Sequence, residues 1–281
     1  MGLKTFIKSL RRHWRGERPI VPVHRQRNDA DQVYEKRMND PCCLERYGYK
    51  VYSQNDEDGI IAEIFNRVGT TNQTFVEFGV HNGLECNSHF LLHKGWNGLW
   101  IDGGAKNCAE IRRLFSAPIA EGRLKVVNAF IDKDNINGLI AGVQQPGTQR
   151  EERAIDLLSI DIDGNDYWVW EAITCVRPRV VVIEYNAKFP PDHVWTMKYA
   201  PNHIWKGDDK HGASLKSLEL LGKKLGYQLV GTNLVGVNAF FVRQDIALNL
   251  FAQPATAENL YNPAGWSVGY VSGHPSREYI G

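Results

Sequence analysis

Two hydrophobic patterns alternate along most of this chain. Short continuous apolar runs, which predict buried strands, cover residues 74–80, 98–101, 124–131, 155–162 and 179–185. Apolar residues spaced three and four apart, which predict helices, lie between them at 57–68, 84–94, 105–115, 135–143 and 167–174. Strands that alternate with helices indicate an α/β fold, in which a doubly wound parallel sheet has helices on both of its faces.

The pattern changes after residue 212. Residues 214–225 predict a helix with Ser214 as its N-cap, and residues 227–231 and 237–243 predict two strands. The connection between these strands is short, which favours an antiparallel pair. The uncharged run 225–242 is long enough to cross a membrane, but it contains three glycines and a Gly-Thr-Asn turn signal. We therefore expect no transmembrane helix there.

The first 27 residues differ from the rest. They contain eight Lys or Arg and one Glu, a net charge of +7 in a chain whose total is +1, so the remaining residues carry −6. Apolar residues three and four apart place Leu3, Phe6, Ile7, Leu10 and Trp14 on one face of a basic amphipathic helix. Such a helix binds an anionic membrane surface, here through residues 1–15, or docks on its own domain or on a second copy in a homo-oligomer. Both interpretations stay open.

Composition adds few constraints. The 281 residues are 43% hydrophobic and 23% charged, which is ordinary for a globular protein and excludes long disordered or collagen-like segments. The near-zero net charge argues against nucleic acid as a partner. Five cysteines without the spacing of a metal site predict reduced thiols and a cytoplasmic protein, or one at the inner face of the membrane if the basic helix binds there.

The strongest chemical signal lies between the first strand and the next helix. The sequence Phe75-Val-Glu-Phe-Gly-Val-His-Asn-Gly83 places Glu77 at a strand end, followed by Gly79 and Gly83 in a turn. Glycines allow the backbone to approach a ligand closely. Asp102 ends the next strand 19 residues after Gly83, where an acidic residue holds the two hydroxyls of a ribose. Together these residues predict a cofactor that contains a nucleoside.

The same stretch favours S-adenosylmethionine over NAD. A dinucleotide site needs a Gly-x-Gly-x-x-Gly turn for its pyrophosphate. Here Glu77 lies inside the motif, where its charge repels a pyrophosphate and attracts the ammonium group of an amino acid. An NAD-linked oxidoreductase therefore stays only as an alternative.

On these residues, the chain resembles the FkbM-like family of class I S-adenosylmethionine-dependent methyltransferases. The resemblance covers about residues 50–245 and rests on Ser53-Gln-Asn-Asp-Glu-Asp-Gly59, Glu77-Phe-Gly-Val-His-Asn-Gly83, Ser159-Ile-Asp-Ile-Asp-Gly-Asn-Asp-Tyr167 and Val182-Ile-Glu-Tyr-Asn186. One departure is His81, which replaces the usual middle glycine of the second motif. The resemblance implies a Rossmann-like seven-stranded sheet whose last strand is antiparallel, and methylation of hydroxyls on sugars or sugar-bearing natural products.

The resemblance also implies domain bounds and contact residues. It divides the chain into a basic extension and linker over residues 1–48, a methyltransferase domain over 49–245 and a loop-rich tail over 246–281. The methionine part of the cofactor would lie near the glycine turn, the ribose at the second strand and the adenine at the third. The residues expected to bind the cofactor are Gln54, Glu77, Gly79, Gly83, Asp102, Asn128 and Asp161.

Acidic residues follow the fourth and fifth strands. Asp161 and Asp163 are expected to share one strand face, since side chains repeat every two residues, and Glu184 and Asn186 to share another. These oxygens suit Mg²⁺ or Ca²⁺, and a similar placement occurs in catechol-type and macrolide-sugar O-methyltransferases, where a metal aligns a substrate diol. The catalytic residues would be Asp161 and Asp163, with His81 as a candidate base. A metal-free reaction and a purely structural role for the acids are the alternatives.

The long segment 186–212 contains three histidines and several aromatic residues. A segment of this length over the carboxyl edge of a sheet is typical of a lid or substrate loop, and aromatic rings stack on sugar faces. Plain loop packing would explain it too. The sequence therefore predicts an S-adenosylmethionine-dependent O-methyltransferase whose acceptor is a saccharide or a glycosylated small molecule. A non-catalytic scaffold protein with the same fold is the alternative from another class.

Overall fold

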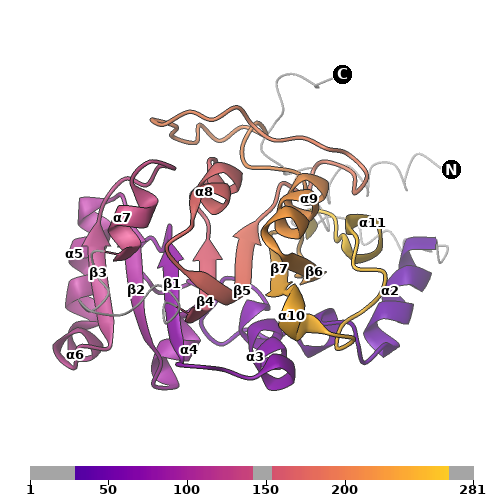
Figure 1. The fold of residues 1–281 in the computed structure, drawn as a ribbon, viewed down its shortest axis with the longest axis horizontal. Helices are drawn as coiled ribbons and strands as arrows, with labels where there is room; N and C mark the ends of the chain where they lie inside the picture. The colour runs from indigo at the N-terminus through magenta and orange to yellow at the C-terminus, as the bar shows by residue number, and fades with distance from the viewer. Residues whose placement is uncertain (1–28, 142–153, 266–281) are drawn as a thin grey trace, which may run out of the picture. The chain divides into compact units, whose positions relative to one another are not determined.

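The computed structural model describes residues 29–141 and 154–265 (Figure 1). The chain divides into two units, residues 1–37 and 38–281. Of the first unit only the helical residues from 29 onward are described; they belong to α2 (Asp29–Asn39), which the hydrophobic pattern did not indicate. The basic helix expected within residues 1–27 and the last 16 residues of the tail lie outside the described residues.

The second unit is built on a seven-stranded sheet. In chain order the strands are β1 (Thr74–Phe78), β2 (Asn97–Asp102), β3 (Leu124–Asn128), β4 (Ala154–Ile160), β5 (Arg177–Glu184), β6 (Tyr227–Thr232) and β7 (Asn238–Arg243). Across the sheet they follow the order β3-β2-β1-β4-β5-β7-β6. Neighbours are parallel except for the two pairs that β7 makes with β5 and β6. The expected Rossmann-like sheet with an antiparallel last strand is confirmed.

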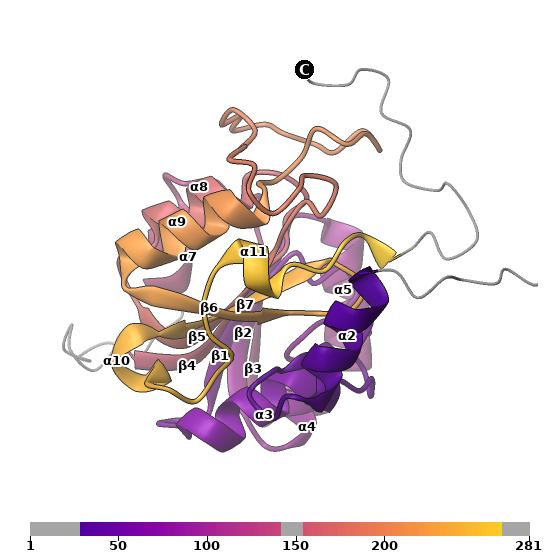
Figure 2. The same cartoon turned by 90° about the vertical axis from the view of Figure 1, so that its right-hand side faces the viewer.

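Helices cover both faces of this sheet (Figure 1 and Figure 2). One face carries α7 (Ile136–Ala141), α8 (Asp166–Ala172) and α9 (Leu215–Leu225), and the other carries α3 (Glu57–Val68), α4 (His89–His93) and α5 (Ala105–Leu114). The central strands between the helices are buried on both sides. In β5, Val181 and Ile183 join one hydrophobic cluster while Val180 and Val182 join the other. This two-sided burial explains why the strands read as continuous apolar runs.

Some element ends differ from the expected ones. β4 ends at Ile160 instead of residue 162 and β3 at Asn128 instead of residue 131. α4 covers five residues instead of 84–94, since residues 79–88 form a turn that the Glu77 carboxylate holds. The hydrophobic pattern did not indicate η1 (Glu45–Tyr47), α6 (Ser116–Ala120), α10 (Gln244–Ala247) or α11 (Ala257–Leu260). The expected N-cap of α9 is confirmed, because the Ser214 hydroxyl accepts from the Ser217 N–H.

Residues on either side of the expected 49–245 domain pack into the same unit. Leu44 is fully buried, and the Cys42 carbonyl accepts from the Ala252 N–H at 3.1 Å. Phe251 is buried as well, and the Thr232 hydroxyl donates to the Leu260 carbonyl at 2.7 Å. Residues 38–48 and 246–265 therefore belong to the second unit together with the sheet. Within the described residues, every helix is too short or too polar to cross a membrane.

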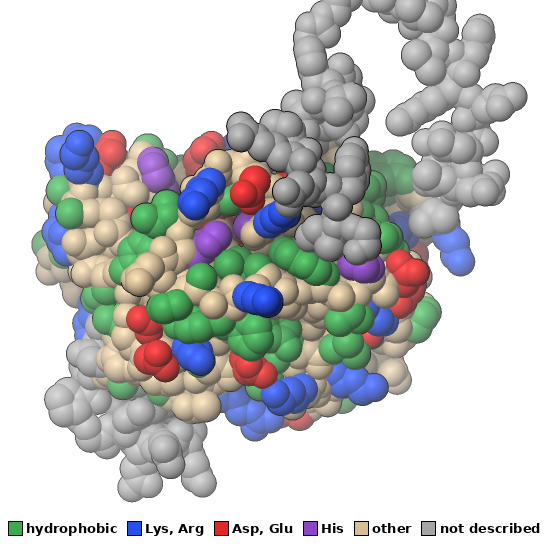
Figure 3. All heavy atoms as spheres, turned by 90° about the horizontal axis from the view of Figure 1, so that it is seen from above, with side chains coloured by type: hydrophobic (Ala, Val, Ile, Leu, Met, Phe, Trp, Pro, Cys, Tyr) green, Lys and Arg blue, Asp and Glu red, His purple; other side chains and the backbone are tan. Residues whose placement is uncertain are grey.

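A long loop, residues 186–212, joins β5 to α9 and runs over the carboxyl edge of the parallel strands (Figure 1). Figure 3 looks down on this side of the molecule, where hydrophobic, histidine and charged side chains of both signs are mixed. The loop is held at residues near its middle. The Trp168 indole donates to the Met197 carbonyl at 2.9 Å, and Thr196 forms a β-bridge with Ala213. The polar atoms of the site lie beneath this loop and the turns beside it.

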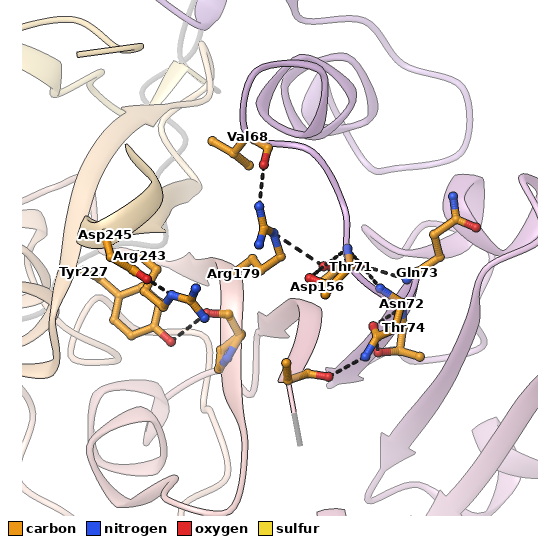
Figure 4. Close-up of polar contacts among 12 residues, drawn as sticks. Val68, Thr71, Asn72, Gln73, Thr74, Asp156, Arg179, Tyr227, Arg243 and Asp245 are labelled. Carbon is orange, nitrogen blue, oxygen red and sulfur yellow. Dashed lines mark hydrogen bonds and ion pairs between the residues drawn. The ribbon is translucent and has the colours of Figure 1, made fainter. Parts of the chain in front are cut away.

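At the amino ends of the strands, opposite the carboxyl edge, one buried carboxylate fixes the connection that leads into β1 (Figure 4). Asp156 on β4 accepts from the backbone N–H groups of Thr71, Asn72 and Gln73 at 2.7–3.0 Å. The Arg179 guanidinium on β5 lies 3.6 Å from the same carboxylate and also donates to the Val68 carbonyl. The connection from α3 to β1 is therefore fixed to two strands at the start of the sheet, far along each strand from the carboxyl edge.

Candidate functional site

Two adjoining pockets open at the carboxyl edge of the parallel strands, and both are lined by Gly79. The larger pocket, of about 260 Å³, is lined by Gln54, Glu77, Gly79, Val80, His81, Asn82, Glu85, Cys86, Asn87, Asp161 and Asn238. The smaller pocket, of about 120 Å³, is lined by Gly79, Ile101, Gly103, Ala129, Phe130, Ile131, Ile162, Asn165 and His203. The first is rich in polar groups and the second in apolar ones. Ligands of doubly wound folds bind at this edge of the sheet.

Gly79 directly follows β1 and lies against the backbone just after β4. Its φ is +76°, and a Cβ added there would lie 1.4 Å from the Asp161 carbonyl oxygen. No other residue fits this position without moving the backbone of one strand end. Gly83 is constrained too, because its φ is +79° and a Cβ would lie 2.6 Å from the Trp100 ring. The two glycines that the sequence singles out therefore shape the turn around both pockets.

Glu77 lines the larger pocket, but its carboxylate accepts several hydrogen bonds from within the protein. Its carboxylate accepts from the backbone N–H groups of Asn87 and Ser88, both at 2.8 Å, and from the hydroxyls of Ser88 and Ser159. Burial raises the pKa of Glu77, while these hydrogen bonds act in the opposite direction. Glu77 thus fixes the turn before α4, and one face of the carboxylate borders the pocket.

Asp102 and Asn128 lie just outside the linings of both pockets. The Asp102 carboxylate accepts from the N–H groups of His81 at 2.8 Å and Gly104 at 2.7 Å, and from the Asn107 amide at 3.0 Å. Asn128 donates from its side chain to the Asp102 carbonyl at 2.9 Å. Their chain neighbours, not these two side chains, line the smaller pocket. Both residues hold the ends of β2 and β3 at the pocket wall.

His81 lines the larger pocket in an unusual backbone conformation. Its φ is +50°, in the left-handed region that the usual glycine of this motif adopts freely. The side chain is exposed, and the backbone N–H is held by Asp102. A histidine in this conformation carries backbone strain and places an imidazole at the larger pocket.

Three carboxylates converge at the ends of β4 and β5. Oxygens of Asp161, Asp166 and Glu184 all lie within 4.8 Å of one another. Asp166 begins α8 and accepts from the N–H groups of Ile162 and Gly164, both at 2.8 Å. Asp161 and Glu184 were expected in such a group; Asp166 was not assigned to it. We refer to these residues as the acidic trio.

The other two expected metal ligands, Asp163 and Asn186, are not members of the acidic trio. Asp163 is exposed with a φ of +56°, because β4 ends at Ile160 and the two-residue period of a strand no longer applies. The Asn186 amide donates to the carbonyls of Asp209 at 2.8 Å and His211 at 3.1 Å. It therefore links the first residue of the long loop to residues near the end of the loop. The expectation that Asp161 and Asp163 share a strand face is wrong for this reason.

Burial and mutual repulsion dominate the electrostatics of the acidic trio. Burial, followed by the neighbouring carboxylates, raises the pKa of Asp161 and of Glu184 well above the ordinary range, and burial raises the pKa of Asp166. The Glu184 Oε2 atom is buried without a hydrogen bond to any described residue, and the His211 Nδ1 atom lies 4.0 Å from it. Three clustered carboxylates with an unbonded oxygen fit a divalent cation with oxygen ligands.

Aromatic rings gather in the long loop. The rings of Phe189 and Trp195 are stacked with centroids 4.5 Å apart, and the His193 ring stacks on Phe189 at 5.5 Å. The His203 Nε2 atom is 3.1 Å from the Asp163 carbonyl, and this residue lines the smaller pocket. The sequence pointed to this loop as a whole but did not separate the pocket residue from the surface stack.

Sequence reasoning included Phe130 only as part of the segment 128–132 expected near the adenine, and it missed Asn238. Phe130 is 53% exposed although it lines the smaller pocket, and an aromatic residue just after a strand was the available signal. Asn238 begins β7 and lines the larger pocket. Nothing in the local sequence marks it, because its position depends on the insertion of β7 beside β5.

Neither a protein-family model nor a curated protein matches this chain. Among solved structures it is similar to the N-terminal domain of EvdMO1 with SAH bound, with a TM-score of 0.43 and 11% identity over 76% of this chain and 95% of that one. A SAM-dependent methyltransferase from Aquifex aeolicus gives a TM-score of 0.38 and 11% identity over 77% and 99%. TrmK from M. capricolum in complex with S-adenosyl-homocysteine gives 0.37 and 8% over 65% and 67%. At these scores the similarities carry no argument about the activity of this chain.

Proposed function

We propose that the protein is an S-adenosylmethionine-dependent O-methyltransferase that acts on a hydroxyl of a saccharide or a saccharide-bearing molecule. The observation that carries this proposal is the pair of pockets that meet at Gly79. One is lined by carboxylates and amides, and the other by apolar side chains. S-adenosylmethionine has the same division, since a cationic amino-acid and sulfonium end is joined to a flat adenine.

Different residues of the two pockets would contact different parts of the cofactor. Phe130, Ile101 and Ile162 offer apolar contacts for the adenine in the smaller pocket. Glu77 and Asp161 border the larger pocket and favour a cationic group there. Asp102 stays our candidate for the ribose, since its oxygens are acceptors at the end of β2 beside both linings.

We further propose that the acidic trio holds a divalent cation such as Mg²⁺. Bound there, the ion would lower the pKa of an acceptor hydroxyl and orient it. Asp161, Asp166 and Glu184 would supply the oxygens, which lie within 4.8 Å of one another. The alternative, favoured by its position at the pocket mouth, is His81 as a base in a metal-free reaction.

The acceptor and the location of the protein are proposals as well. The stacked rings of Phe189 and Trp195 lie in the loop over the site and suit the face of a sugar ring. All five cysteines are free, which supports a reducing compartment such as the cytoplasm.

Calorimetry with S-adenosylhomocysteine tests the cofactor assignment. Wild type should bind it, and Phe130→Ala should weaken binding by about 5- to 50-fold through lost apolar contact. Leu220→Ala is the matched control, because Leu220 is also a half-exposed apolar residue, but on α9 away from both pockets. Wild type that binds neither S-adenosylhomocysteine nor S-adenosylmethionine would leave the scaffold alternative. The metal assignment fails if Mg²⁺ binding is the same in wild type and Asp166→Asn.

A further inference from the structure

Asn238 lies in the larger pocket and has no part in the cofactor contacts described so far. It is the first residue of β7 and lies directly opposite Glu184 on β5. The residue is only 4% exposed, and it lines the pocket together with Gln54, Glu77 and Asp161. Opposite residues of an antiparallel pair present their side chains on the same face of the sheet, so the side chains of Asn238 and Glu184 lie on one face.

A buried network fixes the orientation of the Asn238 amide. Its Nδ2 atom donates to Glu57 Oε1 at 3.0 Å, and that carboxylate is fully buried in α3. The same oxygen accepts from the Asn233 amide at 2.9 Å. A flipped Asn238 amide would set its oxygen against the Glu57 carboxylate. The Oδ1 atom therefore points away from Glu57.

The Asn238 Oδ1 atom is buried but makes no hydrogen bond to any residue that the structure describes. Nearly all buried carbonyl oxygens of folded proteins are paired, because an unpaired one loses its bond to water without replacement. The network around Glu57 holds this oxygen in its unpaired orientation instead of letting the amide rotate. The arrangement is complete only when a donor enters the pocket.

The surrounding wall specifies the charge of that donor. The lining of the larger pocket includes the carboxylates of Glu77, Glu85 and Asp161 and contains neither lysine nor arginine. Such a wall repels phosphate and carboxylate groups and favours a cationic donor. In the cofactor assigned above, the cationic donor is the α-ammonium group of the methionine part.

We propose that Asn238 Oδ1 accepts a hydrogen bond from the α-ammonium group of S-adenosylmethionine, in the orientation that Glu57 fixes. This inference rests on the proposed function and adds a cofactor contact from β7. Asn238 is then a binding residue and Glu57 a positioning residue. This gives a role to one residue of the motif at 53–59, because Glu57 orients the Asn238 amide without contacting the ligand itself.

The test compares two ligands that differ in the amino-acid part. S-adenosylhomocysteine carries the α-ammonium group, whereas 5′-methylthioadenosine shares the nucleoside and lacks the amino-acid portion. In calorimetry on the full chain, Asn238→Ala should weaken S-adenosylhomocysteine by about 10- to 100-fold, the range for a hydrogen bond to a charged group. Binding of 5′-methylthioadenosine should stay unchanged, which also shows that the variant is folded.

The outcomes separate this inference from the proposed function. Wild type that fails to bind S-adenosylhomocysteine overturns both. Wild type that binds it, with an Asn238→Ala variant that binds it equally well, overturns the inference alone. If Asn238→Ala loses Mg²⁺ binding but keeps its affinity for S-adenosylhomocysteine, the Oδ1 atom of wild type binds a metal ion instead. That result also overturns the inference. If Asn238→Ala does not fold, Asn238→Ser takes its place in the same comparison.

Discussion

At the scale of single residues, Gly79 makes the sharpest demand on the chain. A Cβ at this position would overlap the Asp161 carbonyl, whereas Gly122 has a similar φ of +74° and nothing within 4 Å of an added Cβ. Gly122→Ala should therefore cost only the strain of a left-handed alanine, about 1 kcal/mol. Gly79→Ala should cost several times as much or abolish S-adenosylhomocysteine binding. Urea unfolding and calorimetry of both variants measure the difference, and equal losses would show that conformation alone, not contact, requires Gly79.

A second residue-scale prediction concerns pH. His89 is buried beside His93, with the two Nε2 atoms 3.2 Å apart, and the Tyr52 ring stacks on both imidazoles. Burial, and to a smaller extent His93, lowers the pKa of His89. Above about pH 6.5, the ordinary value in an unfolded chain, the group makes no difference to stability. Below this pH the unfolded chain protonates His89 more readily than the folded chain does. The free energy of unfolding therefore decreases as the pH is lowered.

His89→Gln should therefore show a smaller drop in the urea midpoint than wild type between pH 7.5 and pH 5.5. His193→Gln, at an exposed histidine of the long loop, is the control and should follow wild type. A His89→Gln curve parallel to that of wild type would mean that other groups cause the pH dependence.

The sequence identified the residues of the turn better than their contacts. Spacing alone marked Glu77, Gly79 and Asp102, since each follows from where a strand ends. It did not show that Glu77 binds the N–H groups of the next turn, because periodicity says nothing about the path of a turn. Asp163 was preferred over Asp166 on the period of a strand that ends at residue 160.

At the scale of elements, Asp156 should be the carboxylate whose loss costs most. It is fully buried, and it accepts from the N–H groups of three consecutive residues before β1. Asp156→Asn removes part of these acceptors and leaves Arg179 without a charged partner, so we expect a loss of about 2–4 kcal/mol.

Asp245→Asn is the matched control for this prediction. Asp245 also binds an arginine, Arg243, at 2.6 Å, but its side chain is 52% exposed. An exposed ion pair of this kind contributes less than about 1 kcal/mol. Thermal and urea unfolding of the two variants decide the matter, and similar losses would contradict the anchoring role of Asp156.

The elements themselves were accessible from the sequence where burial on one or two faces imposes a period. The helix expected at residues 57–68 matches α3, and the apolar run over 179–185 lies almost wholly within β5. Short helices such as α6 and α11 were not predicted, because they have too few turns to show the hydrophobic period of a helix. α4 is shorter than expected because the Glu77 carboxylate accepts hydrogen bonds from the N–H groups of Asn87 and Ser88 and so shapes the residues just before the helix.

At the scale of the whole molecule, the basic segment and the sheet unit should be separable. Residues 1–27 carry +7 and the rest of the chain −6. A chain that begins at residue 29 should keep the S-adenosylhomocysteine affinity of the full protein. If the segment is a membrane anchor, the full chain should sediment with vesicles that contain anionic lipid and the shortened chain should not. Loss of cofactor affinity on shortening would assign the segment to the fold instead.

The fold class followed from the sequence because alternation of strands and helices is a property of the entire chain. The function of the long loop did not, since stacked rings such as Phe189 and Trp195 arise both in sugar sites and in loop packing. The strand order was reachable only through the resemblance, because no local pattern shows that β7 lies between β5 and β6.

That position of β7 has a consequence for synthesis. The ribosome releases β5 long before it releases residues 238–243, so one edge of the growing sheet stays unpaired until the last strand emerges. Glu184 and Asn238, which lie opposite each other, meet only at that late stage. A nascent chain that stalls before residue 238 therefore carries an open edge strand, the form most prone to pair with another chain. The pairing of β7 with β5 therefore brings Asn238 opposite Glu184 and closes the open edge of β5 in one event.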